Sequence, residues 1–172
     1  MNEAAVAVVQ AVEAAPSLTG AAIAIFGAAL CAGLAGCGSA YGVMAAGKAA
    51  AGVTSEKPDL FGKMLILQAL PGTQGIYGFL VAVIVMLQAG LLGGDPTALT
   101  VSQGWQYFFG ALPMAITGLI SGACQGNAAV AAIHMTGKQP DASGKGITMT
   151  ALVETYAILG LLISILLILG IK

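Results

Sequence analysis

The stretch LQALPGTQGIY, residues 67–77, places oxygen-bearing groups inside an apolar segment. On an α-helix their spacing of i, i+3, i+4 and i+7 puts four residues on one face: Leu70, Thr73, Gln74 and Tyr77. The proline within the stretch cannot donate a helical hydrogen bond, so we expect a kink that bares nearby carbonyls such as that of Leu70. Polar groups gathered at membrane depth cost free energy unless something binds them. The stretch therefore predicts a site for a hard cation.

The composition is that of an integral membrane protein. Of 172 residues, 58% are hydrophobic and 8% are charged, and the mean hydropathy of +0.95 exceeds what a soluble domain of this size needs. The net charge of -1 gives no basic surface for nucleic acid. Three cysteines lie among Gly and Ala without the spacing of a metal site, and we predict that they are packing residues: Cys31, Cys37 and Cys124.

Four apolar segments are long enough to cross a bilayer. The predicted spans are Ser17–Gly47, Phe61–Leu92, Gly104–Met135 and Ile147–Ile171. The predicted connectors are Lys48–Leu60, Gly93–Gln103 and Thr136–Gly146. The fold class is thus an all-α membrane protein with four transmembrane helices in two tandem helical hairpins, residues 17–92 and 104–172, joined by residues 93–103. Residues 1–16 form an Ala/Val-rich extension that we predict to be helical as far as Pro16.

Lysine placement predicts the orientation. The first and third connectors, with their flanks, hold five of the six lysines: Lys48, Lys57, Lys63, Lys138 and Lys145. The second connector carries only Asp95, and residues 1–16 carry only acids. By the positive-inside rule, residues 48–60 and 136–146 are cytoplasmic, and both termini and residues 93–103 are outside. Lys172 at the C-terminus weakly opposes this assignment.

The chain contains an internal repeat. ALPGTQGIYGFLVAVIVM, which begins at Ala69, aligns with ALVETYAILGLLISILLI, which begins at Ala151. We also align GCGSAYGVMAAGK (36–48) with QGNAAVAAIHMTGK (125–138) at their shared Gly-Lys ends. Two spans per copy make the repeat parallel rather than inverted. Glu154 falls opposite Gly72, so we expect one carboxylate for each pair of hairpins.

The odd and even spans differ in side-chain size. The first and third are rich in glycine and alanine, which allows backbones to approach closely, whereas the second and fourth are rich in Leu, Ile and Val. Composition fits two arrangements equally well. The small-residue helices could form the inside of a tight ring with the bulky helices outside, or all four could pack as an ordinary bundle.

Glu154 is the only acid within a predicted span. A charge at the middle of a membrane helix costs about 2.5–3.5 kcal/mol on insertion scales. The alternative is a carboxyl that stays protonated and forms a hydrogen bond with a neighbouring helix. Gln74, Gln125 and Glu154 all lie roughly 12–20 Å along their helices from the predicted cytoplasmic connectors. This common depth favours a shared site over that alternative.

The predicted site offers oxygen ligands only. They are Glu154, Gln125, Gln74, Thr73 and a backbone carbonyl near Pro71. Without a His, Cys or second carboxylate, the set disfavours zinc, copper and iron, and calcium normally takes more anionic ligands. One carboxylate with neutral oxygens suits a monovalent hard cation. Tyr77 is expected to donate its hydroxyl to Glu154 and hold the carboxylate in place, and Thr155 is a second candidate for that role.

Three blocks of the sequence resemble a known family. LQALPGTQGIYGF (67–79), GLISGACQGNAAVAA (118–132) and ALVETYAILGLLISILL (151–167) are similar to the proteolipid (K or c) subunit of bacterial Na⁺-transporting V-type ATPases. The resemblance covers about residues 17–172 and implies a membrane rotor ring of double hairpins with one ion site each. It also implies the ligands, which are the Leu70 carbonyl, Thr73, Gln74, Gln125 and Glu154, with Tyr77 bonded to Glu154. The extension 1–16 is longer than the family pattern predicts.

The resemblance implies a subunit that carries Na⁺ through the bilayer of a bacterial cell membrane by rotation of a homo-oligomeric ring. The chain has no phosphate-binding loop and no arginine. ATP hydrolysis, and the arginine of a stator subunit that opposes Glu154, must therefore come from other subunits. The subunit is not an enzyme on its own, with no catalytic residue or organic cofactor predicted. A central-stalk subunit is expected at cytoplasmic connectors such as Lys48–Leu60.

Other functions remain open from the residues. The same rotor carrying H⁺ would need only Glu154, and Thr73, Gln74 and Gln125 would then have no role. A self-contained small ion transporter or channel would place the polar cluster in a central pathway and would conduct ions without partners. A membrane pore scaffold is a third alternative.

Overall fold

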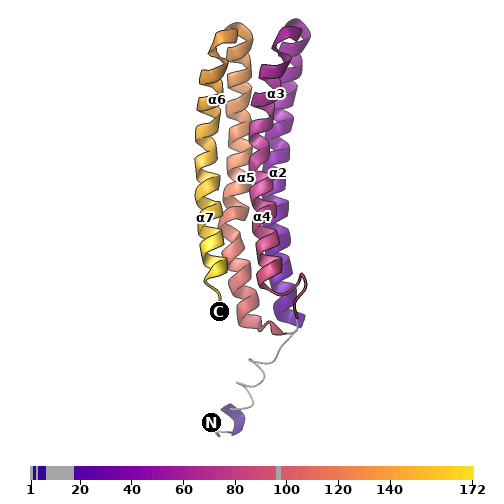
Figure 1. The fold of residues 1–172 in the computed structure, drawn as a ribbon, viewed down its shortest axis with the longest axis vertical. Helices are drawn as coiled ribbons and strands as arrows, with labels where there is room; N and C mark the ends of the chain where they lie inside the picture. Colours follow the sequence, from indigo (N-terminus) through magenta and orange to yellow (C-terminus); the bar gives the residue numbers. More distant parts are fainter. Residues whose placement is uncertain (1, 3, 7–17, 96–97) are drawn as a thin grey trace.

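Four long helical rods run side by side in the computed structural model, which describes residues 2, 4–6, 18–95 and 98–172 (Figure 1). Two rods are continuous helices, α2 (Leu18–Glu56) and α5 (Val101–Lys138). Each of the other two is assembled from short elements. The first consists of η1 (Pro58–Leu60), α3 (Phe61–Ala69), η2 (Leu70–Gly72) and α4 (Thr73–Gln88). The second consists of η4 (Pro140–Ala142), α6 (Ser143–Ala151), η5 (Leu152–Glu154) and α7 (Thr155–Leu169). In the described part of the chain all four rods are long and apolar enough to cross a membrane. The predicted all-α membrane fold is confirmed.

The two halves repeat element by element. Pro58 corresponds to Pro140, a shift of 82 residues, and the same shift relates η2 to η5 and the first residues of α4 and α7. This confirms the alignment of Ala69 with Ala151. The alignment of the odd spans is wrong, because the structure places Glu56 rather than Lys48 opposite Lys138. Gly/Ala-rich segments can be aligned with each other in several registers, so a shared Gly-Lys pair does not determine the correct alignment.

The helices extend further than predicted at the end that holds the lysines. The predicted connector Lys48–Leu60 is mostly helix, because α2 continues through an Ala-rich segment to Glu56. The predicted connector Thr136–Gly146 is likewise short, since α5 ends at Lys138 and α6 begins at Ser143. Both breaks fall immediately before a proline, where the helical conformation is disfavoured.

At the other end the predicted bounds shift by a few residues. α4 ends at Gln88, close to Gly90, which adopts a φ of 70°. α5 begins at Val101, where Thr100 and Gln103 form a capping box. The predicted helical extension 1–16 lies for most of its length outside the described residues.

The turns α2/α3 and α5/α6 lie at the same end of the bundle, and the C-terminus lies at the other end (Figure 1). Lysines of the first hairpin bind backbone carbonyls of the second at this end. Lys57 Nζ donates to the Gly137 carbonyl at 2.5 Å, and Lys63 Nζ donates to the Pro140 carbonyl at 2.9 Å. A cation at the C-terminal end of a helix is favoured electrostatically. The two hairpins are therefore joined where their turns meet.

The continuous helices α2 and α5 pack directly against each other. A Cβ on Gly126 would collide with the backbone of Gly42, so the two helices touch through their backbones. Large apolar side chains on the outer helices remain exposed, for example Phe79 at 64% and Leu166 at 67%. Such a surface is suited to lipid rather than water. Cys31 is buried, as predicted for a packing residue, whereas Cys37 and Cys124 are exposed.

Candidate ion-binding site

Both segmented rods change from α to 3₁₀ geometry halfway along their length. In the first hairpin, η2 begins at Leu70, and the backbone N–H of Thr73 donates to the Leu70 carbonyl. In the second hairpin, η5 ends at Glu154. Of these two turns, only η2 contains a proline, Pro71. The 3₁₀ geometry is therefore a feature of both repeats and does not depend on proline alone. The two turns place Thr73 and Glu154 where each helix departs from regular geometry.

Glu154 is held by a tyrosine of the other hairpin. The Tyr77 hydroxyl donates to Glu154 Oε1 at 2.5 Å, and both side chains are half-buried. This hydrogen bond joins α4 to η5. Since one carboxylate oxygen accepts the tyrosine proton, the second oxygen of Glu154 remains available to another partner.

Two completely buried amides lie between the same helices. Gln74 Nε2 donates to Gln125 Oε1 at 2.5 Å and to Ser121 Oγ at 3.3 Å. Gln125 Nε2 donates to the Thr150 carbonyl at 3.2 Å. The network therefore ties α4, α5 and α6 together through side chains that would be costly to bury alone.

The hydrogen bonds fix which way each amide points. A backbone carbonyl can only accept, so Thr150 requires the nitrogen of Gln125 and turns its oxygen toward Gln74. Gln74 must then present its own nitrogen to Gln125, which turns Gln74 Oε1 away toward Thr73. The orientation of both amides thus follows from an acceptor in the polypeptide backbone.

Oxygens of the first hairpin gather beside the 3₁₀ turn. Thr73 Oγ1 lies 3.2 Å from the Leu70 carbonyl oxygen and 3.5 Å from Gln74 Oε1. A hydroxyl can rotate its proton to suit its neighbours, so it can either donate to these atoms or offer its lone pairs. Carbonyl, hydroxyl and amide oxygen are therefore available within one short segment.

Six of the seven residues that sequence reasoning selected make hydrogen bonds in two sets. One set contains Leu70, Thr73, Gln74 and Gln125, and the other contains Tyr77 and Glu154. Thr155 lies apart, because its side chain is exposed and, within the described chain, makes no hydrogen bond to Glu154. The helices begin closer to the turns than expected, so the distance along the helices from the turns to these residues is longer than the roughly 12–20 Å estimated from the predicted connectors. From Lys57 and Gln139 the site lies roughly 20–25 Å along the rods.

Sequence reasoning missed Ser121. This buried serine on α5 accepts a hydrogen bond from Gln74 and donates one to the Val153 carbonyl at 3.0 Å. One signal was available, because Ser121 precedes Gln125 by one helical turn and shares its face.

The donor set limits the chemistry of the site. In the described residues, no group of three or more His, Cys, Asp or Glu side chains could hold a metal ion. The candidate donors are instead one carboxylate, two amides, the Thr73 hydroxyl and backbone carbonyls. Such ligands suit a hard cation of low charge.

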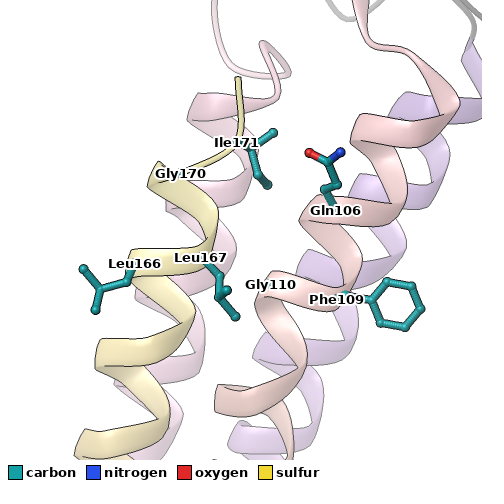
Figure 2. A pocket seen from close by; sticks show the side chains of 7 residues that line it. All are labelled: Gln106, Phe109, Gly110, Leu166, Leu167, Gly170 and Ile171. Carbon is teal, nitrogen blue, oxygen red and sulfur yellow. The ribbon is translucent and has the colours of Figure 1, made fainter.

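A separate pocket lies near the C-terminus, away from this network. Its volume is about 410 Å³, and Gln106 and Gly110 of α5 and Leu167 and Ile171 line part of it. Figure 2 shows Gln106 as its one polar side chain, with Leu166 and Phe109 turned away from the gap. This pocket lacks charged groups, so it does not compete with the site around Glu154.

Comparison with known proteins agrees with the repeated fold. The model of the family described as the ATP synthase C subunit matches twice, at residues 26–85 and 108–167. The chain is 49% identical over 135 residues to V-type sodium ATPase subunit K of Enterococcus hirae, covering 78% of this chain and 83% of that protein. It is 43% identical over 149 residues to A-type ATP synthase subunit K of Methanocaldococcus jannaschii, covering 87% and 64% respectively. It is also 30% identical over 130 residues to the 16 kDa proteolipid of the V-type proton ATPase of Nephrops norvegicus, covering 76% and 79%.

These matches confirm the resemblance to proteolipid subunits. The two matched ranges are related by the same shift of 82 residues as the structural repeat. The chain therefore belongs to the family of the ATP synthase C subunit and carries the family's hairpin twice.

Proposed function

We propose that this chain is a rotor-ring subunit of a rotary ATPase, and that it binds one Na⁺ per double hairpin at Glu154. The observation that carries the proposal is the single carboxylate held by Tyr77, together with a buried pair of oriented amides that Ser121 connects to the neighbouring Val153 carbonyl. The ligands would be Glu154, Gln125, Gln74, Thr73 and the Leu70 carbonyl. The Enterococcus hirae relative, named a sodium ATPase subunit, supports Na⁺ as the transported ion.

The spacing of the oxygens supports an ion of this size. Ligands about 2.4 Å from a cation, a distance typical of Ca²⁺, lie about 3.4 Å apart in an octahedral arrangement, and Na⁺ has nearly the same radius. Thr73 Oγ1 lies 3.2 Å from the Leu70 oxygen and 3.5 Å from the Gln74 oxygen, separations that these atoms also make as hydrogen bonds and that an ion of this radius could span without moving them far. The charge also matches, because one carboxylate neutralises one Na⁺.

Neutralisation explains how the ion could cross the membrane. A Glu154 that holds Na⁺ passes hydrocarbon without the full cost of a bare charge. Where the ring meets a hydrated stator, water and an opposing positive charge would release the ion and admit another. This chain contains no arginine, so a stator subunit must supply that charge, and other subunits must hydrolyse ATP.

The lysine-bearing turns are the proposed cytoplasmic end. Lys57, Lys63, Lys138 and Lys145 all flank the two turns at one end of the bundle. By the positive-inside rule this end faces the cytoplasm of a bacterial cell, and the C-terminus and the middle connector face outward. A central-stalk subunit would contact these turns.

Carbodiimide labelling of Glu154 tests the proposal. In membranes that contain the assembled complex, we expect the reagent to modify the wild-type chain and added Na⁺ to protect it. The E154Q variant should not be labelled, which assigns the reaction to this carboxyl. Unchanged labelling across Na⁺ concentrations, at a pH where Glu154 still reacts, would contradict Na⁺ binding.

A rotor that carries H⁺ is the second candidate, and the Nephrops norvegicus relative, named a proton ATPase proteolipid, favours it. Protonation alone would neutralise Glu154, so the buried amides and Thr73 would have no role in transport. In this case the same labelling experiment would respond to pH and not to Na⁺.

A further inference from the structure

The hydroxyl of Ser121 lies where the two hairpins meet. It is 5% exposed, accepts from Gln74 Nε2 at 3.3 Å and donates to the Val153 carbonyl at 3.0 Å. Val153 immediately precedes Glu154 within η5. We infer that Ser121 is a positioning residue of the ion site, which holds the Gln74 amide in its binding orientation relative to the turn that carries Glu154. This inference rests on the proposed function.

The direction of each hydrogen bond explains why a hydroxyl is needed at this position. The Val153 carbonyl can only accept, so it takes the Ser121 proton and leaves a lone pair of Ser121 Oγ facing Gln74. An alanine would remove both bonds at once. The hydroxyl therefore connects an amide of the first hairpin to the 3₁₀ turn of the second.

Gln74 depends on this contact. Its nitrogen has two protons, of which one goes to Gln125 and the other to Ser121. The Gln125 oxygen that accepts the first proton is itself a proposed ion ligand. Without Ser121, the amide of Gln74 is restrained only by Gln125 and Thr73, which are both proposed ligands of the ion. The expected consequence is a weaker site for Na⁺ rather than a misfolded chain.

The repeat supplies a matched control. Ser39 corresponds to Ser121 through the shift of 82 residues, and it lies beside the first 3₁₀ turn. Its Oγ accepts from the backbone N–H of Gly75 at 2.8 Å and, in the described chain, contacts no proposed ligand side chain through a hydrogen bond. Both serines are buried. Only Ser121 reaches an ion-binding side chain.

The test compares S121A with S39A in the full chain within the assembled complex. The readout is the Na⁺ concentration that protects half of Glu154 from carbodiimide. Because S121A removes two hydrogen bonds, we expect it to raise this concentration roughly tenfold, which corresponds to about 1.4 kcal/mol, whereas S39A should change it by less than about twofold. The pH dependence of labelling without Na⁺ should stay the same in both variants, because Tyr77 still holds Glu154.

Three results would overturn the inference. They are an S121A variant that matches the wild type, an S39A variant that shifts equally, and a change in the pH dependence that accompanies the change in Na⁺ affinity. Should S121A fail to assemble, S121C keeps the volume but accepts hydrogen bonds weakly, and the same shift is expected. A wild-type chain that Na⁺ does not protect would overturn the proposed function itself.

Discussion

At the scale of single residues, the carboxylate of Glu154 depends on one hydroxyl from the other hairpin. The Y77F variant removes the donor to Glu154 Oε1. Since hydrogen bonds to charged groups contribute about 1.5–3 kcal/mol, we expect Na⁺ protection of Glu154 to weaken by about tenfold to a hundredfold.

The control for this prediction is Y107F. Tyr107 donates to the Gln88 carbonyl at 3.1 Å. This hydrogen bond also joins two helices, but it lies near the end of the bundle away from the α2/α3 and α5/α6 turns. Y107F should leave Na⁺ protection unchanged. Equal effects of the two variants would mean that Tyr77 stabilises packing and has no specific role at the carboxylate.

The sequence predicts site residues whose burial in the membrane costs much free energy and misses residues whose burial costs little. Gln74, Gln125 and Glu154 stand out because amides and carboxylates are rare in apolar spans. Ser121 does not, because a serine is small and is tolerated in membrane helices. Thr155 was selected for its proximity to Glu154 in sequence, yet adjacent helical residues point in different directions and Thr155 is exposed.

At the scale of elements, the 3₁₀ turn of the first hairpin does not require its proline. η5 has the same position and length as η2 but contains Leu152, Val153 and Glu154. We therefore expect P71A to keep Na⁺ protection within about threefold of the wild type, since about 0.6 kcal/mol corresponds to that factor. Loss of protection would show that proline alone sets the position of the Leu70 carbonyl.

The close contact of α2 and α5 leads to a second prediction at this scale, which concerns stability. A Cβ on Gly126 would overlap the backbone of Gly42, so G126A must separate the two helices. Overpacking of this kind costs about 1–3 kcal/mol, and we expect a lower unfolding temperature of the purified protein in detergent. Gly144 on α6 has open space around its Cβ position, so G144A should be neutral or slightly stabilising. A G126A variant as stable as G144A would contradict the contact.

Element boundaries were predictable where a specific residue ends a helix. Pro58 and Pro140 explain both breaks at the lysine-bearing end. The predicted connectors are too long because lysine and glycine are common in loops, whereas here Ala-rich sequence continues the helix past Lys48. The 3₁₀ turn at η5 has no such marker, so sequence alone could not place it.

At the scale of the whole molecule, the contact between the two hairpins of one chain indicates which helix faces would meet when a second copy packs beside the first. In α2, Gly38 and Gly42 are covered by α5. Their equivalents on α5 are Ile120 and Cys124, which are exposed and line a cavity of about 380 Å³ together with Tyr156. A contact that repeats in this way from chain to chain is heterologous and closes into a ring when the rotation permits.

The repeat also explains why one chain would carry one ion. The position equivalent to Glu154 is Gly72, and those equivalent to Gln74 and Tyr77 are Tyr156 and Leu159. A contact between two chains would therefore lack a carboxylate. The proposed ion sites would therefore lie at the contact between the two hairpins of each chain.

This arrangement predicts a specific contact between copies. Within the chain, a Cβ on Gly42 would contact Gly122, and one on Gly126 would contact Gly42. The residue equivalent to Gly42 in the second hairpin is Cys124, and the residues equivalent to Gly122 and Gly126 in the first hairpin are Ala40 and Met44. Between copies, Cys124 of one chain should therefore face Ala40 and Met44 of the next. Ala40 is exposed on α2, as this contact requires. In a C37A background, we expect A40C to form a disulfide with the native Cys124 of a neighbouring copy under mild oxidation. Disulfides need Cα separations of about 4.4–6.8 Å, and the side chains at these positions hold the two helices further apart than the glycine contact within one chain.

The readout is a ladder of crosslinked multiples on a denaturing gel, which a reducing agent collapses to the single chain. The control is Y41C in the same background, since residue 41 is the next residue on α2 and points about 100° away. A ladder from A40C and none from Y41C would mean that the contact between hairpins inside one chain is repeated between chains. Equal crosslinking by both variants would require a different face of α2 at the interface, and the fold of one chain would then no longer predict how the ring is built.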